Sequence, residues 1–452
     1  MIEKMKSSIP SSQNNPNILQ TITLQLAYGN RTMPITLPTA NLLGVFEPKP
    51  MTETFDEEAL VEAAMKNPIG KPRLRELAHQ GQKVAIVTSD STRPCPSARL
   101  LPYVINELAD AGIPDKDVFI VLALGLHRPM TTDEIAEVVP PEIQQRMRVL
   151  NHDPADTIHL GVTARGTPVE IFRPLVEADV RICLGNIEFH YYAGYSGGAK
   201  AILPGCASRA AVTANHAMLV LPEAAAGRTE GNPVRADLEE AVAMLGVDFI
   251  LNVIVDGDHH IAGAVAGDAT AAHRAGCRLV AERGMVRIPQ KADIVVASAG
   301  GYPKDINFYQ THKALQNAKH AVKDGGAIIL VGECREGIGH KTFESWLLSP
   351  TPPKERIAMI QKEFVLGGHI AAAIAAIQER AAVYVVTEIP AETWRPSHLL
   401  HYSNAQEALE AASRQLGGTP SVLVLPEAVA VLPVVEGDLA EAPRRDELFK
   451  PG

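Results

Sequence analysis

Two histidines and a lysine surround a glycine-dense loop between residues 186 and 216. An aromatic segment, EFHYY, carries His190, the loop GYSGGAK ends at Lys200, and the segment TANH follows with His216. Glycine has no Cβ, so such a loop can adopt positive φ angles and let a bulky group approach its backbone. A lysine among small and apolar neighbours loses hydration, which lowers its pKa and suits the amine to covalent attachment. These residue types predict a ligand site here.

Other interpretations of the same loop remain open from the residues alone. Glycine-rich turns before a helix can also cradle a phosphate. The loop is not a Walker A loop, because Ala199 and Ala201 flank Lys200, and the GxGxxG fingerprint is absent. A structural tight turn with a solvated lysine is the simplest alternative. Each histidine, taken singly, is more often a structural core residue, and a metal ligand or a general acid–base group is the alternative.

Polar residues also follow two other strand-like runs. The run KVAIVTSD leads into Asp90, Ser91, Thr92 and Arg93, and DVFIVLALG leads into His127 in LHRP. Asp90 and Arg93 could pair to hold a turn, or the guanidinium could present its planar fork to a carboxylate or phosphate. Further along, a glycine-containing turn precedes a predicted helix in the segment GGYPKDINFYQTHKAL.

That helix carries Tyr309, Gln310 and Lys313. Gln310 and Lys313 are three positions apart, so they share one face of the helix. The face could point into a site from a second domain, or it could be an ordinary solvated face of an amphipathic helix.

The elements that position these groups alternate between apolar strands and helices, which predicts parallel α/β sheets. Ligands of such sheets bind outside the carboxyl ends of the strands. The polar turns SDSTRP, GLHRP and GNIEFHYYAGYSGGAK should therefore face one crevice. We expect two α/β domains with mostly parallel sheets and an active-site cleft between them, since 452 residues exceed a typical single domain. The expected divisions are a flexible leader at 1–20, domains at 21–287 and 288–435, and a peripheral tail at 436–452.

Composition narrows the possible partners. The net charge of −10 provides no basic footprint for nucleic acid. No apolar run reaches the length of about 18 residues that a membrane span requires. The five cysteines form no CxxC pair, which is typical of a reducing compartment. The first 20 residues lack the apolar core of a signal peptide, so we expect a cytoplasmic protein.

Together the motifs SDSTRP, LGLHRP, FHYYAGYSGGAKAILPG…H and GGYPKDINFYQTHKAL resemble the nickel-pincer-nucleotide lactate racemase family. The resemblance runs in order from about residue 80 to about residue 340 and includes the separations between His190, Lys200 and His216. It implies a pyridinium-3-thioamide-5-thiocarboxylic acid mononucleotide that carries nickel and is attached to Lys200. It also implies that His216 ligates the nickel and that His127 and His190 act as acid–base residues on opposite faces of the substrate.

The resemblance further implies roles for the remaining polar residues. Those expected to contact cofactor or substrate are Asp90, Ser91, Thr92, Arg93, Tyr309, Gln310 and Lys313. Arg93 and Lys313 would hold the carboxylate of a 2-hydroxy acid. The reaction would remove the C2 hydrogen as hydride to the pincer ring and return it to the other face of a planar 2-keto acid. Maturation would need cofactor-biosynthesis proteins.

The chain departs from the family pattern at Leu126, directly before His127, and at His312, between Gln310 and Lys313. Both could alter the substrate pocket, so malate, an aryl lactate or a sugar acid are alternatives to lactate. A second alternative is a nucleotide-binding, carboxylate-binding or cofactor-handling protein without turnover. A zinc hydrolase built on His127, His190 and His216 would leave Lys200 unexplained.

Overall fold

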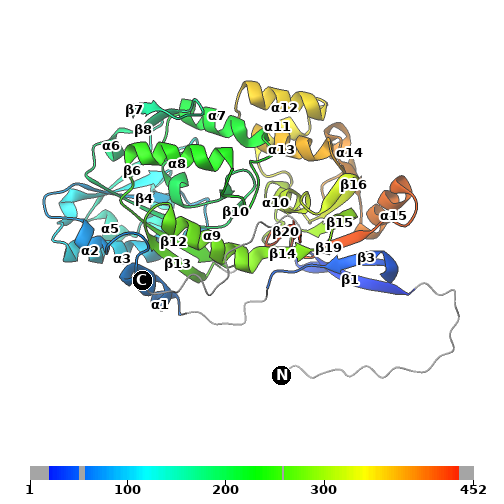
Figure 1. Ribbon diagram of the computed structural model, residues 1–452. Coiled ribbons are helices and arrows are strands. Elements are labelled where there is room, and N and C mark those ends of the chain that lie inside the picture. Colours follow the sequence, from blue (N-terminus) through cyan, green and yellow to red (C-terminus); the bar gives the residue numbers. More distant parts are fainter. Residues whose placement is uncertain (1–19, 50–55, 257–258, 437–452) are drawn as a thin grey trace.

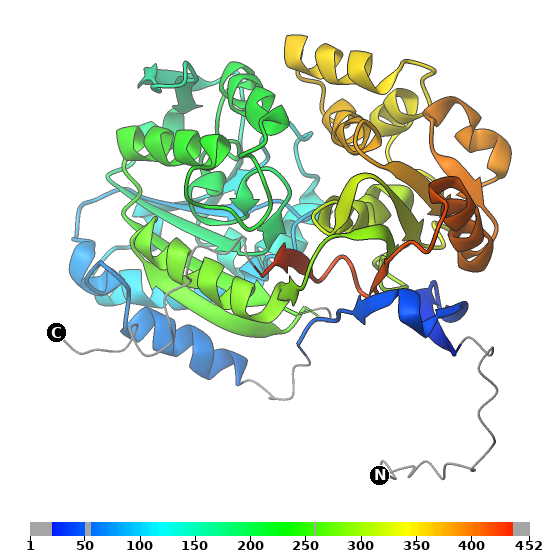
Figure 2. The same ribbon diagram turned by 45° about the vertical axis from the view of Figure 1, so that its right-hand side comes forward.

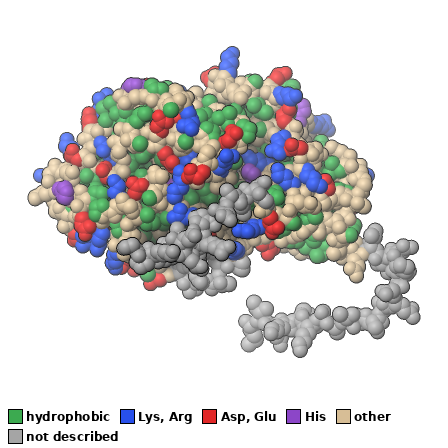
Figure 3. Space-filling model, viewed as in Figure 1, with side chains coloured by type: hydrophobic (Ala, Val, Ile, Leu, Met, Phe, Trp, Pro, Cys, Tyr) green, Lys and Arg blue, Asp and Glu red, His purple; other side chains and the backbone are tan. Residues whose placement is uncertain are grey.

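The computed structural model describes residues 20–49, 56–256 and 259–436, and it contains two α/β lobes side by side (Figure 1). The leader and the tail expected from the sequence therefore lie outside the described residues, apart from Gln20 and Glu436. Within the described part of the chain, no helix is long and apolar enough to cross a membrane. On the face shown in Figure 3, acidic and basic side chains are interspersed.

The first lobe is built on a six-stranded sheet with the order β13-β12-β9-β4-β5-β6. Its strands are β4 (Val84–Ser89), β5 (Val118–Ala123), β6 (Arg148–Asn151), β9 (Val180–Asn186), β12 (Phe249–Val255) and β13 (Ile261–Gly267). All neighbours pair in parallel except β12 and β13, which are antiparallel. The central strands are buried along almost their whole length, which is why they appear in the sequence as continuous apolar runs.

Helices cover both faces of this sheet. They include α1 (Glu57–Lys66), α3 (Ser97–Asp110), α7 (Arg209–Ala217), α8 (Pro233–Leu245) and α9 (Ala271–Gly284). Two small hairpins, β7 (Thr157–Val162) with β8 (Pro168–Phe172) and β10 (Phe189–His190) with β11 (Gly194–Tyr195), lie outside the main sheet. The second hairpin carries His190, so the aromatic segment of the sequence has a defined backbone.

The second lobe contains a parallel six-stranded sheet with the order β18-β17-β16-β15-β19-β3. Its strands are β3 (Leu42–Val45), β15 (Ala292–Ser298), β16 (Val322–Val331), β17 (Ala382–Val386), β18 (Leu400–Tyr402) and β19 (Val422–Leu425). Its helices include α10 (Phe308–Ala318), α11 (Lys341–Leu347), α12 (Pro353–Lys362), α13 (Gly368–Gln378), α14 (Ala391–Trp394) and α15 (Ala405–Leu416). The two sheets confirm the expected fold class.

The N-terminal segment differs from its expected place. Residues 21–49 were expected in the first domain, but β3 pairs with β19, and the hairpin of β1 (Thr21–Tyr28) and β2 (Arg31–Pro38) packs on the second sheet (Figure 2). The hairpin buries Leu26 and Ile35 against that sheet. The alternation of apolar and polar residues predicts a hairpin, but it does not show which of the two sheets the hairpin packs against. A short parallel pair, β14 (Met285–Ile288) with β20 (Leu432–Val435), adds a further connection near the boundary of the lobes.

Candidate active site

The polar turns after β4 and β5 meet at the carboxyl edge of the first sheet. His127 Nδ1 lies 2.5 Å from Asp90 Oδ2, and Thr92 Oγ1 donates to Asp90 Oδ1 over 2.6 Å. Burial raises the pKa of Asp90, but the hydrogen bonds from His127 and Thr92 outweigh it, so this pKa lies below its ordinary value. Asp90 thus holds one ring nitrogen of His127 and leaves Nε2 for proton transfer.

His190 and Lys200 form a second pair at this edge. The Nε2 of His190 lies 3.1 Å from the amine of Lys200, and the backbone N–H of Ala193 donates to Nδ1 over 3.3 Å. Burial, together with the charge of Lys200, holds the pKa of His190 well below its ordinary value. Burial and the charges of Arg93 and Arg235 likewise lower the pKa of Lys200. A neutral His190 that accepts at Nδ1 carries its proton on Nε2, and this N–H donates a hydrogen bond to Lys200 when the amine is uncharged.

His216 lies in the last turn of α7 and is buried between the lobes. Its Nδ1 is 3.2 Å from Asn215 Oδ1, and its ring packs edge-on against Tyr192 at 5.2 Å and Phe364 at 5.1 Å between ring centroids. Burial first, and the nearby charges of Lys200 and His369, hold the pKa of His216 well below its ordinary value. The tautomer that donates from Nδ1 to Asn215 leaves a lone pair on Nε2, the form of imidazole that binds metal ions.

Helix α8 holds the aromatic part of the loop from beneath through two side chains that the sequence analysis missed. Asn232 donates to the carbonyl of Tyr192 over 2.9 Å. Arg235, fully buried, donates from Nε to the carbonyl of Ala193 over 3.2 Å and from its guanidinium to the carbonyl of Tyr195. From the sequence, α8 shows only a capped amphipathic helix, so neither residue carried a signal of this role.

The glycine part of the loop is held by two further buried side chains from β12 and α9. Asn252 Oδ1 accepts the N–H of Gly198 over 2.8 Å, and His273 Nε2 donates to the carbonyl of Ser196 over 2.8 Å. Gly198 has φ +56° and a Cβ there would lie 2.8 Å from the His273 ring, while a Cβ at Gly197 would lie 2.7 Å from Asn252 Oδ1. These close approaches explain why the loop needs glycine.

The second lobe faces the first through α10, which begins at the Asn307 N-cap. The rings of Tyr191 and His312 meet edge-on at 6.3 Å between centroids. Tyr309 lies close enough to Arg93 and Asp90 for both charges to affect its pKa, which burial raises. The structure thus places Tyr309 at the boundary with the first lobe, together with His312, which differs from the family pattern.

The remaining predicted residues have fewer contacts. Gln310 is half-buried and Lys313 is exposed, and neither side chain hydrogen-bonds or pairs with another described residue. Ser91 and Arg93 are exposed, and the charge of Arg93 helps to lower the pKa values of His190, Lys200 and His216. Leu126 packs against the core of the first lobe.

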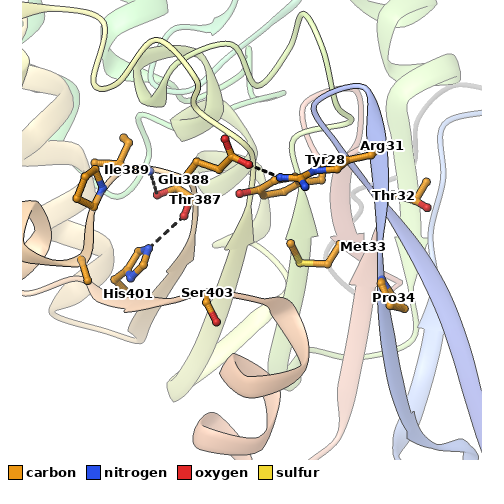
Figure 4. Close-up of a pocket in the computed structure, with 12 residues that line it drawn as sticks. Tyr28, Arg31, Thr32, Met33, Pro34, Thr387, Glu388, Ile389, His401 and Ser403 are labelled. Atoms are coloured by element: carbon orange, nitrogen blue, oxygen red, sulfur yellow. Dashed lines mark hydrogen bonds and ion pairs between the residues drawn. The ribbon is translucent and has the colours of Figure 1, made fainter.

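A separate hollow of about 360 Å³ lies between the β1–β2 hairpin and the end of β17 (Figure 4). Several of its polar groups are paired with one another. Arg31 forms an ion pair with Glu388, and His401 Nε2 lies 3.1 Å from the carbonyl of Thr387. None of the predicted site residues lines this hollow, and its cation is neutralised locally.

The fold and this group of residues define a two-lobed α/β protein with two differently paired histidines and a lysine of lowered pKa at one sheet edge. The profile of the lactate racemase N-terminal domain matches residues 28–227, and that of the C-terminal domain matches residues 288–433. The lactate racemase of Thermoanaerobacterium thermosaccharolyticum is 33% identical over 421 residues, which cover 90% of this chain and 98% of that protein. The lactate racemase of Lactiplantibacillus plantarum is 31% identical over 427 residues, with 91% and 99% covered.

Solved structures agree with these similarities. The lactate racemase apoprotein from T. thermosaccharolyticum superimposes with a TM-score of 0.83 at 33% identity, covering 91% of this chain and all of that one. A Thermotoga maritima protein with a TM-score of 0.57 and 17% identity shares the fold alone. The chain belongs to the lactate racemase family, which confirms the resemblance and places the chain among the racemases, a class of isomerases.

Proposed function

We propose that the protein inverts the C2 stereocentre of a 2-hydroxy acid, lactate or a related acid, with a nickel-pincer nucleotide attached to Lys200. The observation that carries this proposal is the unequal pairing of two histidines at one sheet edge, where His127 is held by Asp90 and His190 by Lys200. Inversion needs a proton acceptor on one face of the substrate and a proton donor on the other. Two imidazoles with separate partners suit that requirement.

The residues present fit the proposed cofactor. Lys200 has the lowered pKa of an attachable amine, and His216 presents one unshared imidazole nitrogen. The described residues include no group of three or more His, Cys, Asp or Glu side chains able to hold a metal by themselves. In this proposal the nucleotide would bring its own donors to the nickel. When bound, this group would supply the hydride acceptor for the C2 hydrogen.

The chain's own residues supply the proton transfers and the orientation. His127 would take the hydroxyl proton at Nε2, because its Nδ1 is committed to Asp90. Attachment at Lys200 would remove the amine that faces His190, which frees that ring for proton transfer on the opposite face. Arg93 and Lys313 would hold the substrate carboxylate, fixing C2 between the histidines. The proposal includes maturation by cofactor-biosynthesis proteins in the cytoplasm.

Intact-protein mass spectrometry and nickel analysis on protein produced together with the cofactor-biosynthesis proteins test this proposal. We expect an added mass that maps to Lys200, bound nickel, and racemisation of a 2-hydroxy acid followed by chiral chromatography. Lys200→Ala should lose the added mass, whereas Lys354→Ala, which removes an exposed lysine, should retain it. An unmodified Lys200 without nickel in the co-produced protein would overturn the cofactor assignment.

A further inference from the structure

The motif GGYPKDIN lies directly before helix α10, and its residues have no role in the proposed function. It belongs to the loop of residues 299–307, which runs from the end of β15 to the N-cap of α10. Asp305 in this loop is fully buried, and its Oδ2 accepts two backbone N–H groups. One belongs to Gly29 in the turn of the β1–β2 hairpin, over 2.7 Å. The other belongs to Glu333, over 3.0 Å, in the loop of residues 332–339 that follows β16.

Further hydrogen bonds join the turn of the β1–β2 hairpin to the loop before α10. The carbonyl of Gly29 accepts the N–H of Tyr302 over 2.9 Å, and the hydroxyl of Ser298 donates to the carbonyl of Ala27 over 2.6 Å. Gly29 has φ +55°, and a Cβ there would overlap the carboxylate of Glu333. The turn can therefore lie this close to the loop because residue 29 has no side chain.

The first turn of α10 is held by both of these loops. The first N–H groups of a helix have no partner within the helix itself. In α10 the N–H groups of Phe308 and Tyr309 donate to two carbonyls of the loop after β16, over 2.9 and 3.0 Å. The next N–H, that of Gln310, donates to Oδ1 of the N-cap Asn307 over 3.0 Å. The position of the two loops therefore determines where α10 begins and in which direction it runs.

Asp305 connects the two loops to each other and to the hairpin. It lies two positions before the N-cap Asn307, and its own carbonyl accepts the N–H of Cys334 over 2.9 Å. Its backbone and its side chain thus hold three segments that are far apart in the sequence. Loss of the carboxylate would leave the N–H groups of Gly29 and Glu333 without their acceptor in a buried setting, so the segments would have to move or take up water.

We propose that Asp305 is a positioning residue, which aligns α10 against the first lobe by tying the start of the helix to the β1–β2 hairpin. This inference rests on the proposed function, in which Lys313 of α10 and Arg93 of the first lobe hold the substrate carboxylate. Tyr309, also on α10, is near enough to Arg93 for that charge to affect its pKa. Because the acid–base histidines belong to the first lobe, a displaced α10 should weaken substrate binding more than it slows the chemistry.

Steady-state kinetics of the nickel-loaded enzyme with lactate test this role. We expect Asp305→Ala to raise KM by about tenfold or more and to change kcat by less than about threefold. Asp305→Asn keeps an oxygen for the two N–H groups and should recover most of the KM. Asp293→Ala is the matched control, because Asp293 also accepts a backbone N–H, that of Ser421, but at the opposite end of β15. An unchanged KM in Asp305→Ala, or a loss of kcat alone, would overturn the inference.

A second variant tests the same contact from the side of the hairpin. Gly29→Ala would press a Cβ against Glu333 and move the turn away from the loop before α10, so it should also raise KM. Gly166→Ala is its matched control, because Gly166 lies in the turn of the β7–β8 hairpin at φ +86° with nothing within 4 Å of a Cβ. Both variants carry the strain of a positive φ. Equal KM values for the two would overturn the part assigned to the β1–β2 hairpin.

Hydrogen exchange separates this inference from the proposed function, because it requires neither cofactor nor turnover. In the full chain we expect the amides of residues 308–313 to exchange about tenfold faster in Asp305→Ala than in Asp293→Ala, as measured by peptide mass spectrometry. Thermal unfolding verifies that both variants fold, and Gly29→Ala with Gly166→Ala replaces the pair if Asp305→Ala does not. Faster exchange in a protein that racemises no acid would support the hold on α10 although the racemase proposal had failed. Equal exchange would overturn the inference and leave the racemase proposal intact.

Discussion

The amine of Lys200 lies 3.1 Å from Nε2 of His190. Because Nδ1 of His190 accepts the backbone N–H of Ala193, the single proton of the neutral ring is on Nε2 and points at this amine. The arrangement favours an uncharged lysine, because the only ring proton of a neutral His190 points at its lone pair. The residue proposed for cofactor attachment, Lys200, is therefore in direct contact with a residue proposed for proton transfer, His190.

Lys200 should react as a neutral amine at lower pH than ordinary lysines. Burial and the charges of Arg93 and Arg235 lower its pKa, so deprotonation occurs below its usual range. Competitive acetylation across pH, followed by peptide mass spectrometry, measures this midpoint. Lys354, whose side chain is 83% exposed, is the internal reference. A midpoint for Lys200 equal to that of Lys354 would contradict the paired geometry.

Asp90→Asn should lower kcat by about 10²-fold or more, because the carboxylate holds Nδ1 of His127 and so selects the ring tautomer that presents Nε2. Steady-state kinetics measure the change. Thr92→Val removes only one hydrogen bond to the same carboxylate and serves as the milder comparison. An unchanged kcat in Asp90→Asn would remove His127 from its assigned role.

The same carboxylate predicts the direction of a pH effect on stability. The pKa of Asp90 is lowered in the folded protein, so its contribution is present above the unfolded value of about 4 and is lost as pH falls through the lower folded pKa. Asp90→Asn should therefore cost about 1–3 kcal/mol at pH 7 and less at acid pH. Urea unfolding at the two pH values measures the difference. A cost that grows towards acid pH would show the opposite linkage.

Arg235→Met should destabilise the protein by about 2–4 kcal/mol, because two loop carbonyls would lose their donor in a buried setting. Urea unfolding provides the measurement. Arg165→Met, which removes an exposed arginine with a 3.9 Å ion pair, is the matched control and should cost under about 1 kcal/mol. Similar costs for the two variants would mean that Arg235 does not hold the loop.

Gly198→Ala should cost more than Gly112→Ala, although both glycines have positive φ, +56° and +77°. Only the first would press a Cβ against a ring, that of His273, whereas nothing lies within 4 Å of the second. We expect about 1–2 kcal/mol for the backbone strain alone and a further penalty at Gly198. Thermal unfolding compares the two variants, and equal losses would contradict the close approach.

The sequence by itself determined the parallel α/β sheets and the polar turns at their carboxyl ends. Buried parallel strands need continuous apolar runs, which can be recognised in the sequence. Glycine, histidine and lysine at fixed separations can likewise be recognised within one segment. Such signals lie within one segment, so they do not depend on the rest of the fold. Asp90, His127, His190 and Lys200 were found in this way, and the structure brings them together as two pairs.

Only the tertiary structure decided which distant surfaces meet. The pairing of β3 with β19 joins segments far apart in the chain, and Arg235 beneath the loop looks in the sequence like any helix residue. Phe364 carries no local signal either, because its place against His216 depends on how the second lobe packs against the first. Burial and hydrogen-bond partners of this kind come from long-range packing, which short-range periodicity does not encode.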